Sequence, residues 1–246
     1  MKKLLNAVFI IFTCLFLYTN IAYSQNIKIT KLDLGKKKEI FVKLKICEKV
    51  ELIEDKYRKP AKDIACLYKN KEGEICRKYI VAAAEGSFSA ENSQEMIIDI
   101  FDDCIPHAGF FGEMLLVRDF KIIQKFDRLG EGMKFFASVN TKSNKSLLLY
   151  ISGYMFQGQG AEYLGLCKFD KSGNSIGANC KHLIEGDIDL SGRGSTEDFS
   201  IKVMDIRDLN GDGLYDLVVK IEKENNNRKK EKIIKLIFDG EKFQIK

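Results

Sequence analysis

Oxygen-bearing side chains alternate along one short polar stretch near the C-terminus, in a spacing that suits a hard divalent cation. Asp208, Asn210, Asp212 and Asp216 occupy positions 1, 3, 5 and 9 of that stretch. A calcium ion takes about six to eight oxygen ligands, and a short loop supplies them by turning alternate side chains inward. Gly213, at position 6, allows a sharp turn because it has no Cβ. The sequence therefore predicts one calcium site, with a simple Asn-Gly-Asp-Gly hairpin turn as the alternative.

The end and the flanks of this stretch differ from those of an EF-hand. An EF-hand loop closes with a bidentate Glu at position 12 and lies between two helices. Position 12 here is Val219, and the flanks Ile201–Ile206 and Leu217–Ile221 are apolar runs typical of strands. The nine-residue form instead resembles the calcium loops of FG-GAP and VCBS repeats in integrin-type β-propellers. That resemblance implies side-chain ligation by Asp208, Asn210, Asp212 and Asp216, and backbone ligation by the Leu214 carbonyl.

A second resemblance involves motifs upstream of the loop. Cys104-Ile105-Pro106-His107-Ala108 is followed by Leu115-Leu116 and then by Gly158-Gln159-Gly160. This order is similar to that of exported bacterial proteins with integrin-like repeats, over roughly residues 96–246. It implies a propeller-like β fold but no particular activity.

The N-terminus has the features of a secretory leader. Lys2 and Lys3 precede an apolar run from Leu4 to Tyr18, and Ala22-Tyr23-Ser24 offers small residues at −3 and −1. We expect residues 1–24 to be cleaved, leaving no stable membrane anchor. A retained anchor is the alternative, although the apolar run is shorter than the ~20 residues that a membrane span needs. The mature protein is then periplasmic or secreted.

An even set of cysteines follows the leader: Cys47, Cys66, Cys76, Cys104, Cys167 and Cys180. In an exported protein such a set indicates disulfides. Cys66 and Cys76 flank one turn-like segment and Cys167 and Cys180 flank another, so each pair could bridge the arms of a hairpin. We therefore expect Cys66–Cys76 and Cys167–Cys180, which leaves Cys47 with Cys104.

Short apolar or β-branched segments recur along the chain, with turn residues between them. The expected strands are Ile40–Ile46, Ile64–Tyr68, Tyr79–Ala83, Met96–Ile100, Met114–Val117, Lys121–Phe126, Phe135–Val139, Ser146–Ile151, Tyr163–Phe169, Phe199–Asp205, Leu217–Ile221, Ile233–Phe238 and Phe243–Ile245. A short helix is expected at Cys47–Tyr57. We predict a single all-β domain over residues 25–246, either a β-propeller-like or partial propeller of short antiparallel blades, or a β-sandwich. The last 46 residues have the length of one propeller blade.

The residues that could support catalysis do not form a known signature. Cys104 and His107 lie close in sequence, as in a thiol enzyme, but an oxidised cysteine is the competing interpretation. Paired acids such as Asp102/Asp103 and Asp187/Asp189 could serve a hydrolase. The formal net charge of +5 includes the two leader lysines, and both signs are interspersed, which does not favour a nucleic-acid partner. We expect a non-catalytic binding or surface-interaction module for a protein or glycan partner, with a secreted hydrolase that uses loop carboxylates as the alternative.

Overall fold

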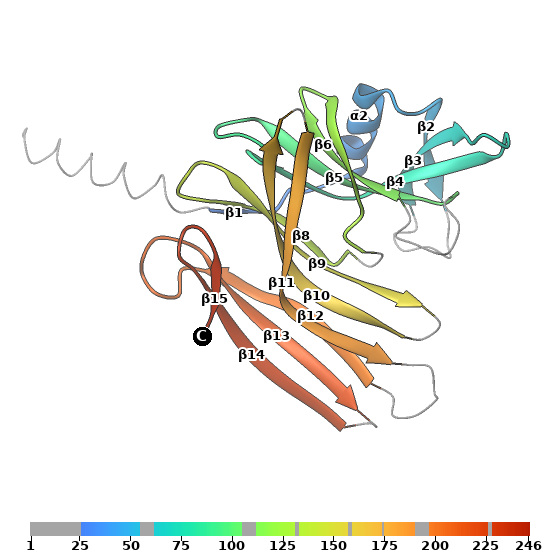
Figure 1. Ribbon diagram of the computed structural model, residues 1–246. Coiled ribbons are helices and arrows are strands. Elements are labelled where there is room, and N and C mark those ends of the chain that lie inside the picture. Colours follow the sequence, from blue (N-terminus) through green and yellow to red (C-terminus); the bar gives the residue numbers. More distant parts are fainter. Residues whose placement is uncertain are drawn as a thin grey trace, which may run out of the picture.

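The computed structural model contains two antiparallel β-sheets and, within the residues it describes, one α-helix. The described residues are 26–54, 62–104, 112–130, 133–156, 159–173, 175–189, 197–225 and 228–246. The expected all-β class is confirmed. The two sheets pack in the manner of the sandwich alternative rather than as radial blades, and the strand order within each sheet is open, not closed into a barrel (Figure 1).

Six strands that follow one another along the chain form the N-terminal sheet, in the order β2-β3-β4-β5-β6-β7. They are β2 (Lys49–Glu54), β3 (Lys62–Lys69), β4 (Ile75–Gly86), β5 (Glu95–Asp102), β6 (Gly112–Arg118) and β7 (Lys121–Asp127). Each pair of neighbours is antiparallel. Because every connection joins adjacent strands, this sheet is a simple meander.

Nine strands form the C-terminal sheet, in the order β1-β8-β9-β10-β11-β12-β13-β14-β15. They are β1 (Ile27–Lys28), β8 (Phe135–Asn140), β9 (Ser146–Phe156), β10 (Gln159–Ser172), β11 (Ser175–Asp189), β12 (Glu197–Arg207), β13 (Asp216–Asn225), β14 (Arg228–Phe238) and β15 (Phe243–Ile245). The N-terminal β1 joins this sheet by pairing with β8. The last four strands, expected as one blade, are therefore a continuous part of the larger sheet.

Helix α2 (Leu34–Leu44) replaces an expected strand, so the prediction of a strand at Ile40–Ile46 is wrong. The Asp33 side chain accepts a hydrogen bond from the Lys36 amide at 2.7 Å, which caps the first turn. At the other end Lys45 adopts the left-handed conformation, and its N–H donates to the Phe41 carbonyl. The alternation of apolar residues and lysines from position 42 to 46 resembles a strand, but the buried face follows helical spacing.

The predicted helix at Cys47–Tyr57 is also wrong, because Lys49–Glu54 forms β2 and pairs with β3. Lys49–Glu54 forms hydrogen bonds with β3, and the spacing of residues within Cys47–Tyr57 does not reveal this pairing. The other expected strands all fall within observed strands. Three observed strands, β1, β2 and β11, have no counterpart among the expected ones.

One apolar layer holds the two sheets together, and a second packs α2 against the N-terminal sheet. Between the sheets, Ile97 and Met114 of the N-terminal sheet pack with Tyr150 and Phe169 of the C-terminal sheet. Phe169 makes edge-to-face contacts with two rings from the N-terminal sheet region, Phe88 at 5.7 Å and Phe126 at 5.4 Å between centroids. Such aromatic pairs add about 0.5–1.5 kcal/mol beyond their buried area. On the opposite face of the N-terminal sheet, Ile40, Phe41 and Leu44 of α2 are buried.

A third apolar cluster lies where the C-terminal sheet curls on itself. Leu149 and Ile151 of β9 pack in one cluster with Leu217, Val219 and Leu236 from the far strands. Consecutive residues of β9 thus serve different cores, since Leu148 and Tyr150 face the N-terminal sheet. This alternation is the period of two expected of a strand buried on both faces.

All six expected cysteines form disulfides, but only one expected pairing is confirmed, Cys167–Cys180 across the β10–β11 hairpin. The observed bonds Cys47–Cys66 and Cys76–Cys104 contradict the expected Cys66–Cys76 and Cys47–Cys104. In the β3–β4 ladder Cys66 lies opposite Lys78 and Cys76 opposite Tyr68. Diagonal neighbours of this kind have Cα atoms about 7–8 Å apart, beyond the usual disulfide span of about 4.4–6.8 Å.

The leader expected at residues 1–24 lies outside the described residues. Within those residues, no helix combines the length and apolar character required to cross a bilayer.

Candidate functional site

The expected cation loop joins two strands of the C-terminal sheet, as its flanks predict. β12 ends at Arg207 and β13 begins at Asp216, and these two residues face each other in the ladder. Gly211 and Gly213 adopt positive φ values of 79° and 84°. Side chains with a Cβ rarely adopt this conformation, so the two glycines make the tight turn possible.

Asp208 closes the loop on itself. Its Oδ1 accepts hydrogen bonds from the N–H groups of Gly211 at 2.7 Å and Asn210 at 3.2 Å, and its Oδ2 accepts from Gly213 at 2.9 Å. The Gly213 amide, followed by the other loop amides, holds the pKa of the Asp208 carboxyl below its usual value. The carboxylate is therefore charged at neutral pH and lies at an exposed turn.

Asn210 and Asp212 continue the same pattern along the loop. The Asn210 Oδ1 accepts from the Asp212 N–H at 3.1 Å, and the Asp212 Oδ1 accepts from the Leu214 N–H at 2.8 Å. The Asn210 amide also donates to the Asp212 Oδ2 at 2.9 Å. Alternate side chains thus turn toward the backbone, which is the arrangement that their spacing predicts.

Asp216 differs from the other three residues because it is fully buried. Its Oδ2 accepts from the Leu209 N–H and its Oδ1 from the Phe238 N–H, both at 2.8 Å. These bonds connect the start of the loop with β14. Asp216 therefore anchors the loop to the core of the C-terminal sheet.

Asn26 is a supporting residue that the sequence analysis did not identify. Its Oδ1 accepts from the Tyr215 N–H at 2.6 Å, and its Nδ2 donates to the Tyr215 carbonyl at 3.2 Å. The two residues are 189 positions apart. No local pattern could have shown that the residue just before β1 pairs with the end of this loop.

The oxygen atoms of the loop are of the kind that a hard cation binds, but its carboxylates are not placed around a common centre. Three carboxylates, one amide and the Leu214 carbonyl are the oxygen ligands that calcium prefers, and a carboxylate oxygen that accepts one N–H keeps a second lone pair. Among the described residues, however, no group of three or more His, Cys, Asp or Glu side chains is gathered as a metal site. Asp216 in particular is directed at two backbone amides rather than toward the half-buried Asp208 and the exposed Asp212.

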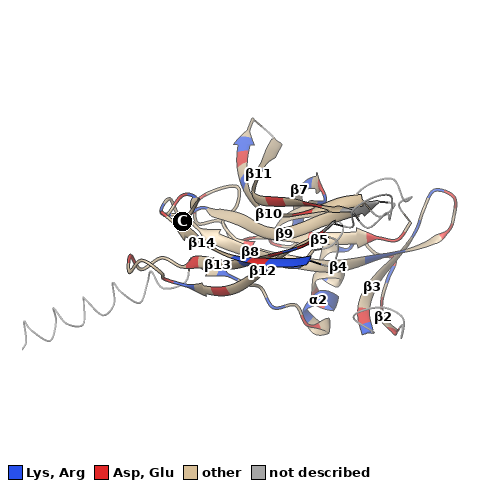
Figure 2. Ribbon diagram, turned by 90° about the horizontal axis from the view of Figure 1, so that it is seen from below, with Lys and Arg blue, Asp and Glu red and all other residues tan. Residues whose placement is uncertain are grey.

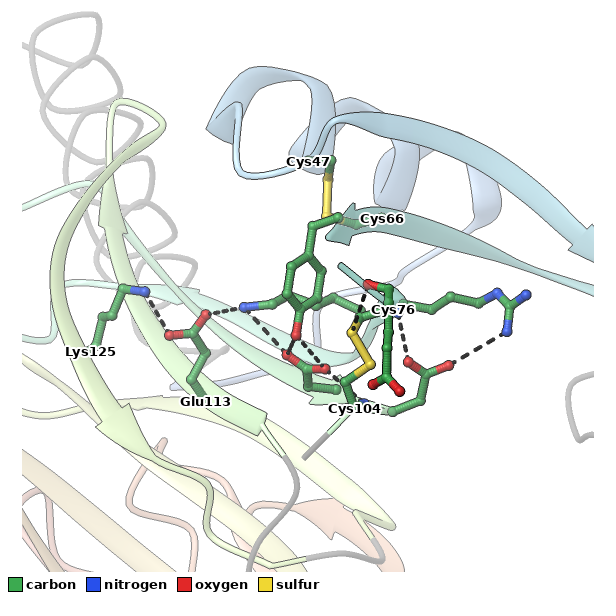
Figure 3. Close-up of polar contacts among 12 residues, drawn as sticks. Cys47, Cys66, Cys76, Cys104, Glu113 and Lys125 are labelled. Atoms are coloured by element: carbon green, nitrogen blue, oxygen red, sulfur yellow. Dashed lines mark hydrogen bonds and ion pairs between the residues drawn. A yellow bond between two sulfur atoms is a disulfide. The ribbon is translucent and has the colours of Figure 1, made fainter. Parts of the chain in front are cut away.

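Asp102, the first acid of the expected pair Asp102/Asp103, belongs to a network of charged groups that includes Glu113 and Lys125 (Figure 3). The Tyr68 hydroxyl donates to both oxygens of Asp102, and the Lys78 ammonium lies 3.6 Å from it. Lys78 also contacts Glu113, which contacts Lys125 of β7. Asp103 instead accepts from the Arg77 N–H at 2.6 Å. The two carboxylates therefore have separate structural partners and do not face each other across a cleft.

The structure describes some, but not all, of the residues on which the thiol-enzyme and paired-acid hypotheses depend. Cys104 is bonded to Cys76, so its sulfur is not a free nucleophile. His107 lies outside the described residues, and the side chain of Asp189 in the second acid pair is likewise not described. The other histidine, His182, stacks on Tyr163 at 4.1 Å and lies 3.0 Å from Glu185, with its side chain partly exposed.

No protein-family model, no curated protein and no solved structure matches this chain.

Proposed function

We propose that this chain is an exported, calcium-binding, non-catalytic module that binds a protein or glycan partner. The observation that carries this proposal is the loop between β12 and β13. It presents Asp208, Asn210 and Asp212 at an exposed turn, while the buried Asp216 fastens the turn to the core. Calcium bound there would stabilise the connection between two interior strands of the sheet rather than perform chemistry. The loop sequence further supports a relationship to the FG-GAP and VCBS repeats.

The disulfides support export to the periplasm or the medium. Three bonds link all six cysteines that follow the expected leader. Disulfides form and persist in oxidising compartments and are rare in a reducing cytosol. A chain that depends on three of them is suited to work outside the cytoplasm.

Thermal unfolding with and without calcium tests the proposed site. A ligand that binds only the folded state adds about 2.7 kcal/mol of stability at a hundredfold excess over Kd. Extracellular calcium modules have Kd values of about 10⁻⁴–10⁻³ M. We therefore expect millimolar calcium to raise the melting temperature relative to chelator, and magnesium to raise it less, because magnesium demands tighter octahedral geometry.

The variant Asp212→Ala should lose this calcium response, because it removes a central carboxylate and leaves both glycines of the turn. Asp239→Ala is the matched control. Asp239 accepts from the Glu241 and Lys242 N–H groups at 2.9 Å in the β14–β15 turn, without an alternating series of acids. The control should be destabilised to a similar extent yet keep the response. An equal melting temperature of the wild type in calcium and in chelator would show that the loop is only a turn.

A further inference from the structure

A cavity of about 590 Å³ opens between helix α2, β1, the end of β8 and two loops of the N-terminal sheet. Those loops are the β4–β5 loop (residues 87–94) and the β6–β7 turn (118–121); the β8–β9 turn (141–145) follows Asn140, the residue of β8 that lines the cavity. The β4–β5 loop and the β8–β9 turn lie next to each other (Figure 1). Pockets that bind small molecules commonly have volumes of about 300–1,000 Å³, and loops held by a rigid scaffold are the usual place for binding residues.

Hydrogen bonds between loops hold the rim of this cavity in place. The Ser146 hydroxyl accepts from the Ser87 N–H at 2.9 Å and donates to the Asn140 side chain at 2.8 Å. The Asn92 N–H donates to the Asn144 carbonyl. These bonds join the two sheets at the cavity mouth, so the rim is formed before any ligand arrives.

Glu95, whose side chain is fully buried, connects the β4–β5 loop with the β6–β7 turn. One carboxylate oxygen accepts from the Ser89 N–H at 2.8 Å, and the other accepts from the Arg118 guanidinium at 2.6 Å. Ser89 belongs to the β4–β5 loop and Arg118 begins the β6–β7 turn. This carboxylate is thus used to position the walls and is not available to a ligand.

Phe120 lines the cavity from the β6–β7 turn in a conformation that is costly for its residue type. Asp119 and Phe120 have φ values of 50° and 56°, and they lie between the paired residues Arg118 and Lys121. A two-residue turn with both φ values positive strongly prefers Asn-Gly or Asp-Gly. The Lys43 ammonium lies 4.3 Å from the centre of the Phe120 ring. A half-buried aromatic ring kept at a position suited to glycine indicates a role other than stability.

The polar groups around the ring are mixed in type and balanced in charge. Neither the Gln94 amide nor the Asp119 carboxylate, both exposed, forms a hydrogen bond or ion pair with any described residue. Lys28 pairs with Glu85 at 2.8 Å, and the Lys36 ammonium lies 3.9 Å from Glu39 and 4.0 Å from Glu85. Donors and acceptors are therefore both available, without an excess of either sign. Figure 2 shows the same interspersion of charges along the strands.

We propose that this cavity binds a short neutral oligosaccharide. This inference deepens the binding role proposed above and rests on it. A sugar presents hydroxyl groups that both donate and accept, which suits Asp119, Gln94 and Lys36, and it presents an apolar C–H face, which suits the Phe120 ring. An anionic ligand would meet the unpaired Asp119 carboxylate beside the Phe120 ring, and burying a charge without a partner is costly.

Calorimetric titration of the full mature chain with a panel of neutral hexasaccharides tests the proposal. The probes are maltohexaose, cellohexaose, laminarihexaose, mannohexaose and N-acetylchitohexaose, with hexagalacturonate as the anionic comparison. At least one neutral probe should bind, and hexagalacturonate should bind at least tenfold more weakly. Binding to no neutral probe, or tighter binding of hexagalacturonate, would overturn the proposal.

Phe120→Gly is the decisive variant, because glycine suits the turn. It should weaken binding of the best probe at least tenfold without lowering the melting temperature, which separates loss of a contact from loss of the fold. Asp119→Asn should weaken binding without altering the turn. Tyr154→Ala is the matched control: Tyr154 is an exposed aromatic residue of β9, far along the strand from Ser146. Its binding should equal that of the wild type, and unchanged binding by Phe120→Gly would contradict the proposal.

The calcium response of the melting temperature is measured on the same samples. If the protein responds to calcium but binds no saccharide, this result contradicts only the inference about the cavity. A chain that binds a saccharide without any calcium response contradicts the metal site and leaves the cavity assignment standing.

Discussion

Buried carboxylates at the ends of strands organise the two loop regions on which the proposals depend. Asp216 and Glu95 are both buried, and each accepts hydrogen bonds from backbone amides of a neighbouring segment. A buried carboxylate requires such partners, because an unpaired charge in an apolar environment costs several kcal/mol. At both places the buried carboxylate therefore holds the loop in position, and contacts with a ligand are left to the exposed residues nearby.

Replacement of Asp216 should destabilise the protein even without calcium. Asp216→Ala leaves the Leu209 and Phe238 N–H groups without their acceptor, and an unsatisfied buried donor costs about 1–3 kcal/mol. We expect a loss of about 2–4 kcal/mol in the free energy of unfolding, measured by urea denaturation in chelator. Asp170→Ala, which removes an exposed carboxylate 3.4 Å from Lys168, should cost less than ~1 kcal/mol. Similar losses for both variants would exclude the anchoring role.

Glu95 should make stability depend on pH in the acid range. Burial raises the pKa of Glu95, but hydrogen bonds from Ser89 and Arg118 together lower it by more. The pKa of Glu95 in the folded state therefore lies below its ordinary value. The unfolded state then binds a proton first as the pH falls. The contribution of Glu95 is complete above the unfolded pKa of about 4.3 and is lost as the pH falls through the lower folded value.

The comparison with Glu95→Gln isolates this contribution. The difference in the free energy of unfolding between wild type and variant should be constant near neutral pH and should shrink below about pH 4. Urea denaturation at several pH values measures it. A difference that grows on acidification would mean that the folded pKa is raised instead.

At the level of elements, covalent links reinforce neighbours that the sheets have already brought together. Cys76 and Cys104 close the β4–β5 pair beyond its last ladder residues, and Cys47 links the segment after α2 to β3. Cys167 and Cys180 are direct ladder partners. The disulfides thus follow the sheet register, and the turn lengths alone do not determine them.

Peptide mapping under non-reducing conditions should recover these three linkages. We expect Cys167→Ser with Cys180→Ser to cost about 3 kcal/mol, because the cross-link spans 13 residues and restricts the unfolded chain. The corresponding pair of changes at Cys76 and Cys104, which spans 28 residues, should cost somewhat more. A peptide that contains Cys66 bonded to Cys76 would contradict the β3–β4 register.

At the scale of the whole molecule, the apolar layer between the sheets encloses an ion pair between Arg128 and Asp99. Arg128 donates to Asp99 through two nitrogens, both at 2.7 Å, and both side chains are almost completely buried. Asp99 lies on the face of β5 that meets the C-terminal sheet, as does Ile97 two residues away. Such a pair orients the chain after β7 against β5, but it adds less net stability than its short distances suggest.

Removing one charge of this pair should destabilise the protein more than replacing both charged residues with apolar ones. Asp99→Ala removes the carboxylate that two nitrogens of the buried Arg128 guanidinium contact, and it should cost about 3–5 kcal/mol. The double change Asp99→Leu with Arg128→Met should recover most of that loss, because neither charge then remains in the apolar layer. Urea denaturation of the single and double variants measures the difference. A double variant as unstable as the single one would show that the pair itself is required for packing.

The sequence alone determined the features that depend on neighbouring residues. β-branched and alternating segments predicted most strands, and the spacing of acids and glycines predicted the turn at Asp208–Asp216. The short separation of Cys167 and Cys180 predicted their disulfide. Ladder and turn chemistry is local, so a window of a few residues contains the information.

The tertiary structure decided what depends on residues far apart in the chain. The partners of Cys66 and Cys76 follow from strand register, and helix α2 forms because Asp33 caps it and the N-terminal sheet buries Ile40 and Phe41. The contact of Asn26 with Tyr215 and the cavity beside Phe120 join segments from opposite ends of the chain or from both sheets. Packing of distant surfaces overrides local preference, because burial stabilises these contacts by more than the few tenths of a kcal/mol per residue that separate helix from strand propensities.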